Sequence, residues 1–494
     1  MPNPLFWLSF TRQRYISYSG LQAGAGTRRS ARAKLIPLPG SPQRIHALAT
    51  LGHPVQRAGT QVRRLPETPD PLILKDRPRR ADPQTALPHL ATGWLQRRWG
   101  ALLRTGTPRL NTLYIVAGLI TTLVLVGCSS SSIKETPPAE LHPLEKPIPL
   151  RTLWQGEVDD GTQEQALQLV PAAADGRVYA AARSGLVRAF DATSGKIVWS
   201  VETDALLAGG PGVGDGLVLL GTSTAEVIAL NGENGEQRWR TKVSSEVLSV
   251  PATAEGLVVV HCSDGQVFAL DSADGKIKWT YQRNLPLLTL HGVGSPVISN
   301  GAAIVGFAGG KLVSLDLTDG SPRWESTITL PRGRTELERM ADLDSRPVVR
   351  DGVIYVAVFQ GDVAAVAEEN GHVLWRRPLS SHVGLAADWR YLYVVDDDDN
   401  IWALDPTNGA ALWKQKKLNH RTLSPPTVVD DTLIVGDFEG YLHWLTTEEG
   451  RLIGRIRIGS GPIHQAVQPA DGVLYVYNDD GTVAAVSAAP PDSQ

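Results

Sequence analysis

The sequence lacks most of the side chains that enzymes use for chemistry. Its 494 residues include only two Cys, and these are too far apart to form a paired-Cys metal motif. The G-x-S-x-G, H-E-x-x-H and Walker patterns are absent, so the common signatures of serine hydrolases, zinc proteases and nucleotide-binding loops are excluded. The eleven His residues show no ligand spacing. We therefore predict no catalytic residue, no metal site and no cofactor.

One acidic run needs a separate interpretation, because carboxylates also bind calcium. Residues 396–399 are four consecutive Asp residues, and Asn400 follows them. They occupy the position at which other repeats of the chain have a hairpin glycine. We therefore predict a solvated turn, with a calcium site as the alternative.

What the sequence does contain is an eightfold repeat with a period near 40 residues. In five copies a Pro is followed 28 residues later by a Trp. These pairs are Pro171 and Trp199, Pro211 and Trp239, Pro251 and Trp279, Pro296 and Trp324, and Pro347 and Trp375. Leu385 with Trp413 and Pro426 with Gly454 keep the distance with one partner replaced, and a last copy begins near Val467. Such a period indicates identical units that stack to bury one another's apolar faces.

Each copy has the pattern of short antiparallel strands. In residues 176–199, β-rich runs of five or six residues are separated by Ser184-Gly185 and by a turn that ends at Gly195. X-Gly turns between such runs are typical of hairpins. We expect the Asp of the recurring triplet Ala189-Phe190-Asp191 to bond backbone amides of its turn. The predicted fold is all-β, an eight-bladed β-propeller of four-stranded antiparallel blades over residues 151–490.

The count of strands predicts how the ring closes. Seven outer strands inside the repeats carry the Trp position, but there are eight inner sets of strands. Residues 151–158, which contain Trp154, have the pattern of the missing outer strand. We predict that this N-terminal strand completes the C-terminal blade and leaves no open sheet edge. We also expect each Trp to lie flat between adjacent blades.

An apolar run precedes the repeats. Residues 113–126 carry no charge, follow Arg104 and Arg109, and are short for a bilayer span. The run ends in Leu125-Val126-Gly127-Cys128, which resembles a bacterial lipobox, where the Cys is acylated and becomes the mature N-terminus. We predict lipidation at Cys128, a signal segment over 111–127 and a flexible tether over 128–150. A membrane span with an incidental Cys is the alternative.

The first 110 residues differ in composition from the rest. They hold 18 Lys and Arg against 4 Asp and Glu, and they show no hydrophobic periodicity. We predict a disordered segment or an over-extended gene start, with a basic nucleic-acid-binding or transit-like tail as the alternative. Removal of residues 1–127 leaves 30 basic and 47 acidic residues, a net charge of −17. We therefore predict no nucleic-acid partner, and we expect the remaining Cys262 to be buried.

Two consecutive connections between repeats are longer than the others. They separate the Trp from the start of the next copy by 17 and 23 positions, against 10 to 13 elsewhere. The first contains Leu285, Leu287, Leu288 and Leu290, and the second contains Arg339, Asp342 and Asp344. Because both are the same kind of connection on neighbouring blades, we expect them on one face, as a protein-docking surface. The alternative is that the leucines fold back onto the propeller.

The repeats resemble a known enzyme group. The segments AFDATSGKIVW, ALDSADGKIKW and ALDPTNGAALW are similar to the repeats of pyrroloquinoline-quinone (PQQ) dehydrogenases, which are eight-bladed propellers. In those enzymes the quinone lies between a Trp and a vicinal disulfide, with calcium on carboxylates and an amide. This chain has no vicinal Cys pair, so the resemblance predicts the fold and leaves a quinoprotein dehydrogenase as an alternative function.

A second resemblance covers residues 128–488. The lipobox, the eight repeats, and the segments TELERMADLDSRP (335–347) and VGDFEGYLHW (435–444) are similar to the BamB family, lipoproteins of the outer-membrane β-barrel assembly (Bam) machine. The resemblance implies a non-catalytic scaffold that is lipid-anchored at the periplasmic face of the outer membrane. It also implies binding to the periplasmic domains of BamA, a place beside the other Bam subunits, and assistance to unfolded outer-membrane protein precursors. An unrelated propeller adaptor is the alternative.

The same resemblance implies particular contact residues. In the BamB family an L-x-L-R segment and a D-x-D loop bind BamA. The matching residues here are Leu288 and Leu290, followed by His291 in place of the Arg, and Asp342 and Asp344. With the neighbouring Arg339 they form the predicted partner-binding site.

Overall fold

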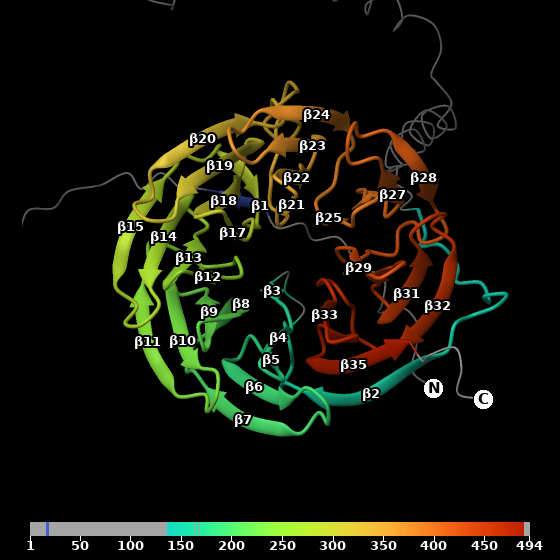
Figure 1. Ribbon diagram of the computed structural model, residues 1–494, viewed down its shortest axis with the longest axis horizontal. Coiled ribbons are helices and arrows are strands. Elements are labelled where there is room, and N and C mark those ends of the chain that lie inside the picture. The colour runs from blue at the N-terminus through green and yellow to red at the C-terminus, as the bar shows by residue number, and fades with distance from the viewer. Residues whose placement is uncertain (1–15, 19–135, 164, 166, 489–494) are drawn as a thin grey trace, which may run out of the picture. The chain divides into compact units, whose positions relative to one another are not determined.

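The computed structural model describes residues 16–18, 136–163, 165 and 167–488. Figure 1 shows that the strands of residues 150–488 form sheets arranged around a ring. No helix occurs among the described residues, and this part of the chain therefore has no helix that could cross a membrane. Cys128 and the signal segment 111–127 lie outside the described residues.

Eight antiparallel sheets form the blades, as the repeat predicts. In the first four blades the strands, from the ring centre outward, are as follows. Blade 1 contains β4 (Ala172–Ala174), β5 (Arg177–Ala181), β6 (Leu186–Asp191) and β7 (Ile197–Glu202). Blade 2 contains β8 (Leu207–Gly214), β9 (Leu217–Thr222), β10 (Glu226–Asn231) and β11 (Gln237–Lys242). Blade 3 contains β12 (Ala252–Ala254), β13 (Leu257–His261), β14 (Gln266–Asp271) and β15 (Ile277–Gln282). Blade 4 contains β17 (Val297–Ser299), β18 (Ala302–Phe307), β19 (Lys311–Asp316) and β20 (Pro322–Thr327).

The other four blades repeat this order. Blade 5 contains β21 (Val348–Arg350), β22 (Val353–Ala357), β23 (Asp362–Ala367) and β24 (Val373–Pro378). Blade 6 contains β25 (Gly384–Ala387), β26 (Leu392–Val395), β27 (Ile401–Leu404) and β28 (Ala411–Gln415). Blade 7 contains β29 (Thr427–Val429), β30 (Thr432–Gly436), β31 (Tyr441–Thr446) and β32 (Leu452–Arg457). Blade 8 contains β33 (Gln468–Ala470), β34 (Val473–Tyr477), β35 (Thr482–Ala488) and β2 (Leu150–Glu157).

Blade 8 confirms the predicted closure. Its outer strand β2 comes from the N-terminal side of the repeats and pairs antiparallel with β35, from Leu150 opposite Ala488 to Glu157 opposite Thr482. In Figure 1, β2 runs along the lower right edge of the ring, outside β35. Every blade then has four antiparallel strands, and β3 adds a short parallel strand at the inner edge of blade 2.

A Trp on the outer strand joins each of seven blades to the next one. The Trp154 indole Nε1 donates a hydrogen bond of 2.9 Å to the Ala192 carbonyl of blade 1. Equivalent bonds of 2.8 to 3.0 Å come from Trp199, Trp239, Trp279, Trp324, Trp375 and Trp413. Each ring also lies on the turn glycine of the next blade. At Gly275, φ is +73° and a Cβ atom would lie 2.7 Å from the Trp239 ring, so both the backbone and the packing require glycine.

The acid of the recurring triplet stabilises the turn, as predicted. Asp191 Oδ1 accepts hydrogen bonds from the backbone amide and the hydroxyl of Ser194, at 2.8 and 2.7 Å. These bonds lower the pKa of the Asp191 carboxyl. The corresponding Asp271, Asp316 and Asp405 accept amide bonds in the same place. Their role is therefore to fix the turn on which the Trp of the preceding blade lies.

The outer strand of blade 7 has no Trp, and Ile148 and Leu150 take the place of that side chain. A Cβ atom on Gly454 would lie 3.0 Å from Ile148 and 3.1 Å from Leu150, so these two side chains occupy the space beside the glycine. The expectation of a flexible tether over 128–150 is wrong for its last part. The Ala139 amide donates to the Asn419 carbonyl at 2.9 Å, and the Ile148 amide donates to the Ile453 carbonyl at 2.8 Å.

Removal of the Trp that closes the ring tests this architecture. Trp154→Ala deletes a buried ring and its bond to Ala192, and we expect the free energy of unfolding to fall by about 3–5 kcal/mol in urea titrations. Leu153, its neighbour on β2, is exposed, so Leu153→Ala is the matched control and should change stability by about 0.5 kcal/mol or less. Equal effects of the two substitutions would contradict the role of Trp154.

Candidate protein-docking site

The alternation of strand direction gives the propeller two different faces. The hairpins between the second and third strands of each blade, and the connections between blades, lie on one face, which we call the connection face. The hairpins between the first and second strands, and between the third and fourth, lie on the other, which we call the turn face. The two long connections follow β15 and β20, so both lie on the connection face.

Asp342 fastens the two long connections together. Its Oδ2 accepts a hydrogen bond of 2.6 Å from the Leu290 amide of the first connection. Its backbone forms a β-bridge with Ala308 and accepts a bond of 2.9 Å from the Phe359 amide. The residue is 2% exposed. The structure thus brings Leu290 and Asp342 together, and it gives Asp342 a structural contact inside the surface.

Leu343 and Asp344 continue this link. Leu343 is fully buried in the core between blades 4 and 5, whereas Asp344 is half-buried beside the first connection. A Cβ atom on Gly292 would lie 3.0 Å from Asp344 Oδ2, so a side chain at this position would crowd the carboxyl group. The alternation of side chains in Asp342-Leu343-Asp344 therefore directs both acids toward the first connection and the leucine into the core.

Burial governs the charge of both acids. It raises the pKa of Asp342, although the Leu290 amide opposes the shift. It raises the pKa of Asp344 well above the ordinary value, and the negative charge of Asp342 adds to that effect. A cationic group placed near Asp344 would relieve the cost of its ionisation, so this acid favours a positively charged contact.

The leucines of the first connection are divided between core and surface. Leu285 packs against the core between blades 3 and 4, whereas Leu287 is 66% exposed. Leu288 and Leu290 are half-buried and belong to β16 (Leu288–Leu290), whose backbone pairs antiparallel with β1 (Ile16–Tyr18). The β16 backbone is therefore held in a conformation that accepts another strand along its edge.

The two basic positions of the predicted site lie in different settings. His291 Nε2 is 3.6 Å from the Glu246 carboxylate, which belongs to the connection between blades 2 and 3. Arg339 is exposed, and its guanidinium lies 3.7 Å from Glu336 within its own connection. His291 is thus part of the cluster around Leu290 and Asp344, and Arg339 extends the surface along the second connection.

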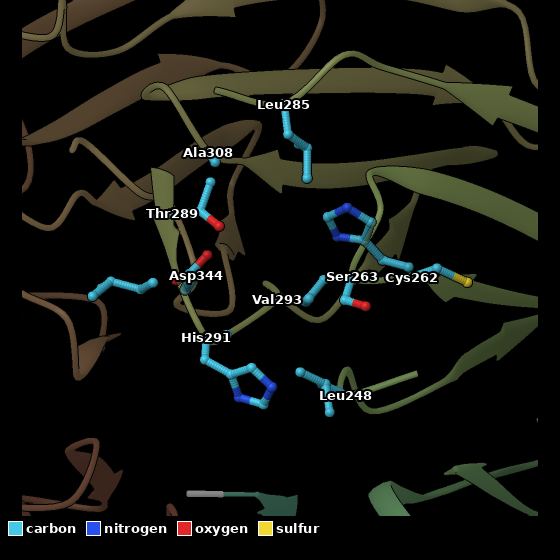
Figure 2. A pocket seen from close by; sticks show the side chains of 12 residues that line it. Leu248, Cys262, Ser263, Leu285, Thr289, His291, Val293, Ala308 and Asp344 are labelled. Carbon is cyan, nitrogen blue, oxygen red and sulfur yellow. The ribbon is translucent and has the colours of Figure 1, made fainter. Parts of the chain in front are cut away.

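A small cavity lies beneath this surface. It has a volume of about 30 Å³, and Figure 2 shows Leu248, His291, Val293 and Asp344 around it. That volume holds one or two water molecules. Cys262 contributes to its lining and is fully buried, as expected from its apolar strand, and burial raises the pKa of the thiol to about 12.

Gln168 supports the first connection from the centre of the ring, and sequence reasoning did not identify it. It lies on β3 (Gln168–Leu169), which pairs parallel with β8 and lies near the ring centre in Figure 1. Its Nε2 donates to the Val293 carbonyl at 3.0 Å, and its Oε1 accepts from the Ser295 hydroxyl at 2.7 Å. Its partners are more than a hundred residues away, so no local pattern could have indicated this contact.

The acidic run 396–399 is a turn, but the prediction that it is solvated is wrong for two of its residues. Asp396 and Asp399 are buried. Asp396 accepts bonds from Asn400 and from the Trp402 indole, and Asp399 accepts bonds from the Thr422 and Leu423 amides. These carboxylates satisfy protein donors. Among the described residues, no group of three or more His, Cys, Asp and Glu side chains could hold a metal ion.

The fold defines the class of the protein, an eight-bladed β-propeller whose two longest connections lie together on the connection face. The family model described as outer membrane protein assembly factor BamB matches residues 151–204, 183–415 and 403–490. The BamB protein of Alkalilimnicola ehrlichii is 49% identical over 378 residues, which cover 76% of this chain and 97% of that relative. The BamB protein of Pseudomonas aeruginosa is 42% identical, with 74% and 96% covered. The chain therefore belongs to the BamB family of outer membrane protein assembly factors.

Solved structures agree with this assignment. BamB from Moraxella catarrhalis superposes with a TM-score of 0.63 at 26% identity, covering 68% of this chain and 99% of that one. The quinohemoprotein alcohol dehydrogenase of Comamonas testosteroni gives a TM-score of 0.54 at 14% identity, covering 70% and 78%. The second similarity is one of fold alone. Family membership thus makes the chain a non-catalytic assembly factor, and it does not support the quinoprotein alternative.

The cavity contains a histidine that gives the stability a specific pH dependence. His261 is buried against Phe307 and lies 3.2 Å from the Gly294 carbonyl, and burial lowers its pKa to about 4. Between pH 6.5 and 4 the unfolded chain binds a proton here that the folded chain does not. The free energy of unfolding therefore falls by about 3 kcal/mol over this range as pH decreases.

His261→Gln should abolish that contribution, which urea unfolding at pH 7 and pH 4.5 would measure. The pKa values of Asp342 and Asp344 are raised in the folded chain, so these two groups increase the free energy of unfolding as pH falls. Their effect is present in both proteins, so the difference between the two curves isolates His261. Parallel pH curves for wild type and variant would show that the assignment is wrong.

Proposed function

We propose that this assembly factor is a lipoprotein of the periplasmic face of the outer membrane, and that its two long connections bind the periplasmic domains of BamA. The observation that carries the proposal is the hydrogen bond from Leu290 to Asp342. Because this bond joins the connections, their exposed groups form one continuous surface in a fixed shape. A preformed surface loses less conformational entropy on binding than two free loops would lose.

The groups of this surface have distinct roles in the proposed complex. Leu287, Leu288 and Leu290 supply apolar area, and a strand of the partner takes the place of β1 along the β16 edge. In the mature lipoprotein that the lipobox predicts, β1 is removed and this edge is free. Asp344 offers a partly desolvated carboxyl group to a cationic side chain of the partner. Asp342 maintains the shape of the surface from within.

A wider role follows from the same arrangement. A scaffold that binds the periplasmic domains of BamA also lies beside the other Bam subunits. It can then hold those domains in a position that favours insertion of unfolded outer-membrane protein precursors. This role needs no catalytic group in the propeller.

The membrane anchor is tested by mass spectrometry of protein extracted from membranes. We expect the N-terminus to be Cys128 carrying diacylglyceryl and acyl chains, which together give a firm anchor. Cys128→Ser should give a protein without lipid that no longer fractionates with membranes. A mature wild-type protein that retains residues 1–127 and is released in soluble form would contradict this assignment.

The docking surface is tested by measuring the kinetics of binding to purified BamA periplasmic domains. Leu288→Ala with Leu290→Ala should weaken binding by about 5- to 100-fold, equivalent to about 1–3 kcal/mol, through faster dissociation. Asp344→Asn should slow association and reduce its salt dependence. Asp342→Asn should weaken binding by loosening the link to Leu290, which hydrogen exchange at the Leu290 amide would reveal.

The matched control is Leu206→Ala. Leu206 is 45% exposed and lies on the same face, in the connection between blades 1 and 2. Its replacement should leave binding unchanged. A folded variant with Leu288, Leu290 and Asp344 all replaced that still binds like the wild type would remove this surface from consideration.

A further inference from the structure

The segment before β2 follows the outside of blade 7 from one face of the propeller to the other. We call residues 139–149 the strap. The strap begins at the Asn419 carbonyl, in the connection between blades 6 and 7, which lies on the connection face. It ends at Leu150, which is opposite Ala488 at the turn-face end of blade 8. The exposed Pro143, Pro147 and Pro149 favour an extended backbone over this path.

A buried polar cluster holds the first half of the strap. Arg421 is 3% exposed and donates Nη1 to the Ala139 carbonyl at 3.0 Å. The same guanidinium donates Nε to Asp437 at 2.8 Å and pairs with Glu439. His443 donates Nε2–H to the same Asp437 oxygen at 2.8 Å, and its Nδ1 accepts from Arg455 Nε at 3.3 Å. Arg455 Nη1 then reaches the His142 carbonyl at 3.4 Å.

The charge state of this cluster is well defined. Burial by itself would raise the pKa of Asp437, but the hydrogen bond from His443 and the charge of Arg421 outweigh it, and the pKa lies below the ordinary value. Burial lowers the pKa of His443. Asp437 is therefore ionised between two donors, and the cluster presents one guanidinium N–H group to each of two strap carbonyls. These charge-assisted hydrogen bonds hold the strap backbone against blade 7.

Apolar contacts hold the rest of the strap. Leu141 packs against the core between blades 6 and 7. Ile148 and Leu150 pack against the core between blades 7 and 8, beside Gly454 where the other blades have Trp. The missing Trp of blade 7 is thus the feature that makes room for the strap.

From these contacts we propose that the strap carries the membrane anchor from the turn face to the connection face, so that the face with the docking loops is directed toward the membrane. The proposal rests on the proposed acylation of Cys128. Ten residues, 129–138, separate that Cys from the strap and span at most about 35 Å. If the strap came away, the chain would leave the propeller at Leu150 on the turn face, with a span of about 70 Å.

Energy transfer to a membrane dye distinguishes the two arrangements. Lys417 is exposed on the connection face, just before blade 7, and Glu449 is exposed on the turn face of blade 7. The acylated protein, with Lys417→Cys or Glu449→Cys labelled by a donor dye, is reconstituted in phosphatidylethanolamine and phosphatidylglycerol vesicles that contain a headgroup acceptor. Cys262 is buried and does not compete for the label. We expect higher transfer from position 417 than from position 449.

Leu141→Asp with Ile148→Asp breaks the strap without touching Arg421 and Asp437, whose separation would leave a buried charge unpaired. This variant should abolish or reverse the difference between the two labels. Leu412→Asp places one such carboxylate on an exposed outer-strand position of blade 6 and should preserve the difference. Equal transfer in the wild type, or a difference that survives in the strap variant, would overturn the proposal.

Failure of the anchor is distinguishable from failure of the strap. If Cys128 is not acylated, the protein does not float with vesicles, and the proposed lipoprotein assignment fails. The strap is tested separately in the soluble Cys128→Ser chain by hydrogen exchange. There the Ala139 amide should exchange on the order of 100-fold more slowly than in the strap variant. A rapidly exchanging Ala139 amide in the otherwise wild-type chain would also overturn the proposal.

Discussion

The contact between an outer-strand Trp and the turn glycine of the next blade is the interaction on which the rest of the structure depends. Each indole donates to a carbonyl of the next blade and covers a glycine that has no room for a Cβ atom, as at Trp239 and Gly275. Trp154 makes the same contact from β2, which precedes the repeats in the sequence and completes the last blade. A single repeated contact therefore both stacks the blades and closes the ring. The positions of all connections on the connection face follow from the alternating strand directions of the blades that this contact stacks.

The proposed docking surface is a local departure from this regular frame. Two connections lengthen on neighbouring blades, and Asp342 converts them into one unit through the Leu290 amide. Gln168 adds a second support from the ring centre. The blades provide a rigid support, and the long connections provide the apolar and charged groups that contact a partner. An adaptor of this kind needs no enzyme-like pocket. Blade 7 differs from the other blades at its outer strand. Gly454 occupies the position that Trp has elsewhere, and Ile148 fills the space beside it.

Much of the fold was predictable because it depends on the spacing of residues within each repeat. The 28-residue distance from Pro to Trp predicts the number and positions of the blades. The additional Trp154 predicts the strand that closes the ring. The proximity of the Leu288 and Asp342 segments also followed, since consecutive long connections must emerge side by side. The burial of Asp342 and the support from Gln168 did not follow, because each depends on a contact between residues that are distant in sequence. The strap was mistaken for a free tether for the same reason, since Arg421 lies 282 positions from Ala139.

The central claim is that the connection face, at blades 3 and 4, is where the assembly machine binds. The most direct test is photo-crosslinking in cells from two positions at opposite ends of β15. Leu287 is exposed on the connection face, and Lys276 is exposed on the turn face of the same blade. A photoreactive residue at position 287 should form a crosslink to BamA, and the same residue at position 276 should form none. A crosslink to BamA from position 276 with none from position 287 would contradict the account.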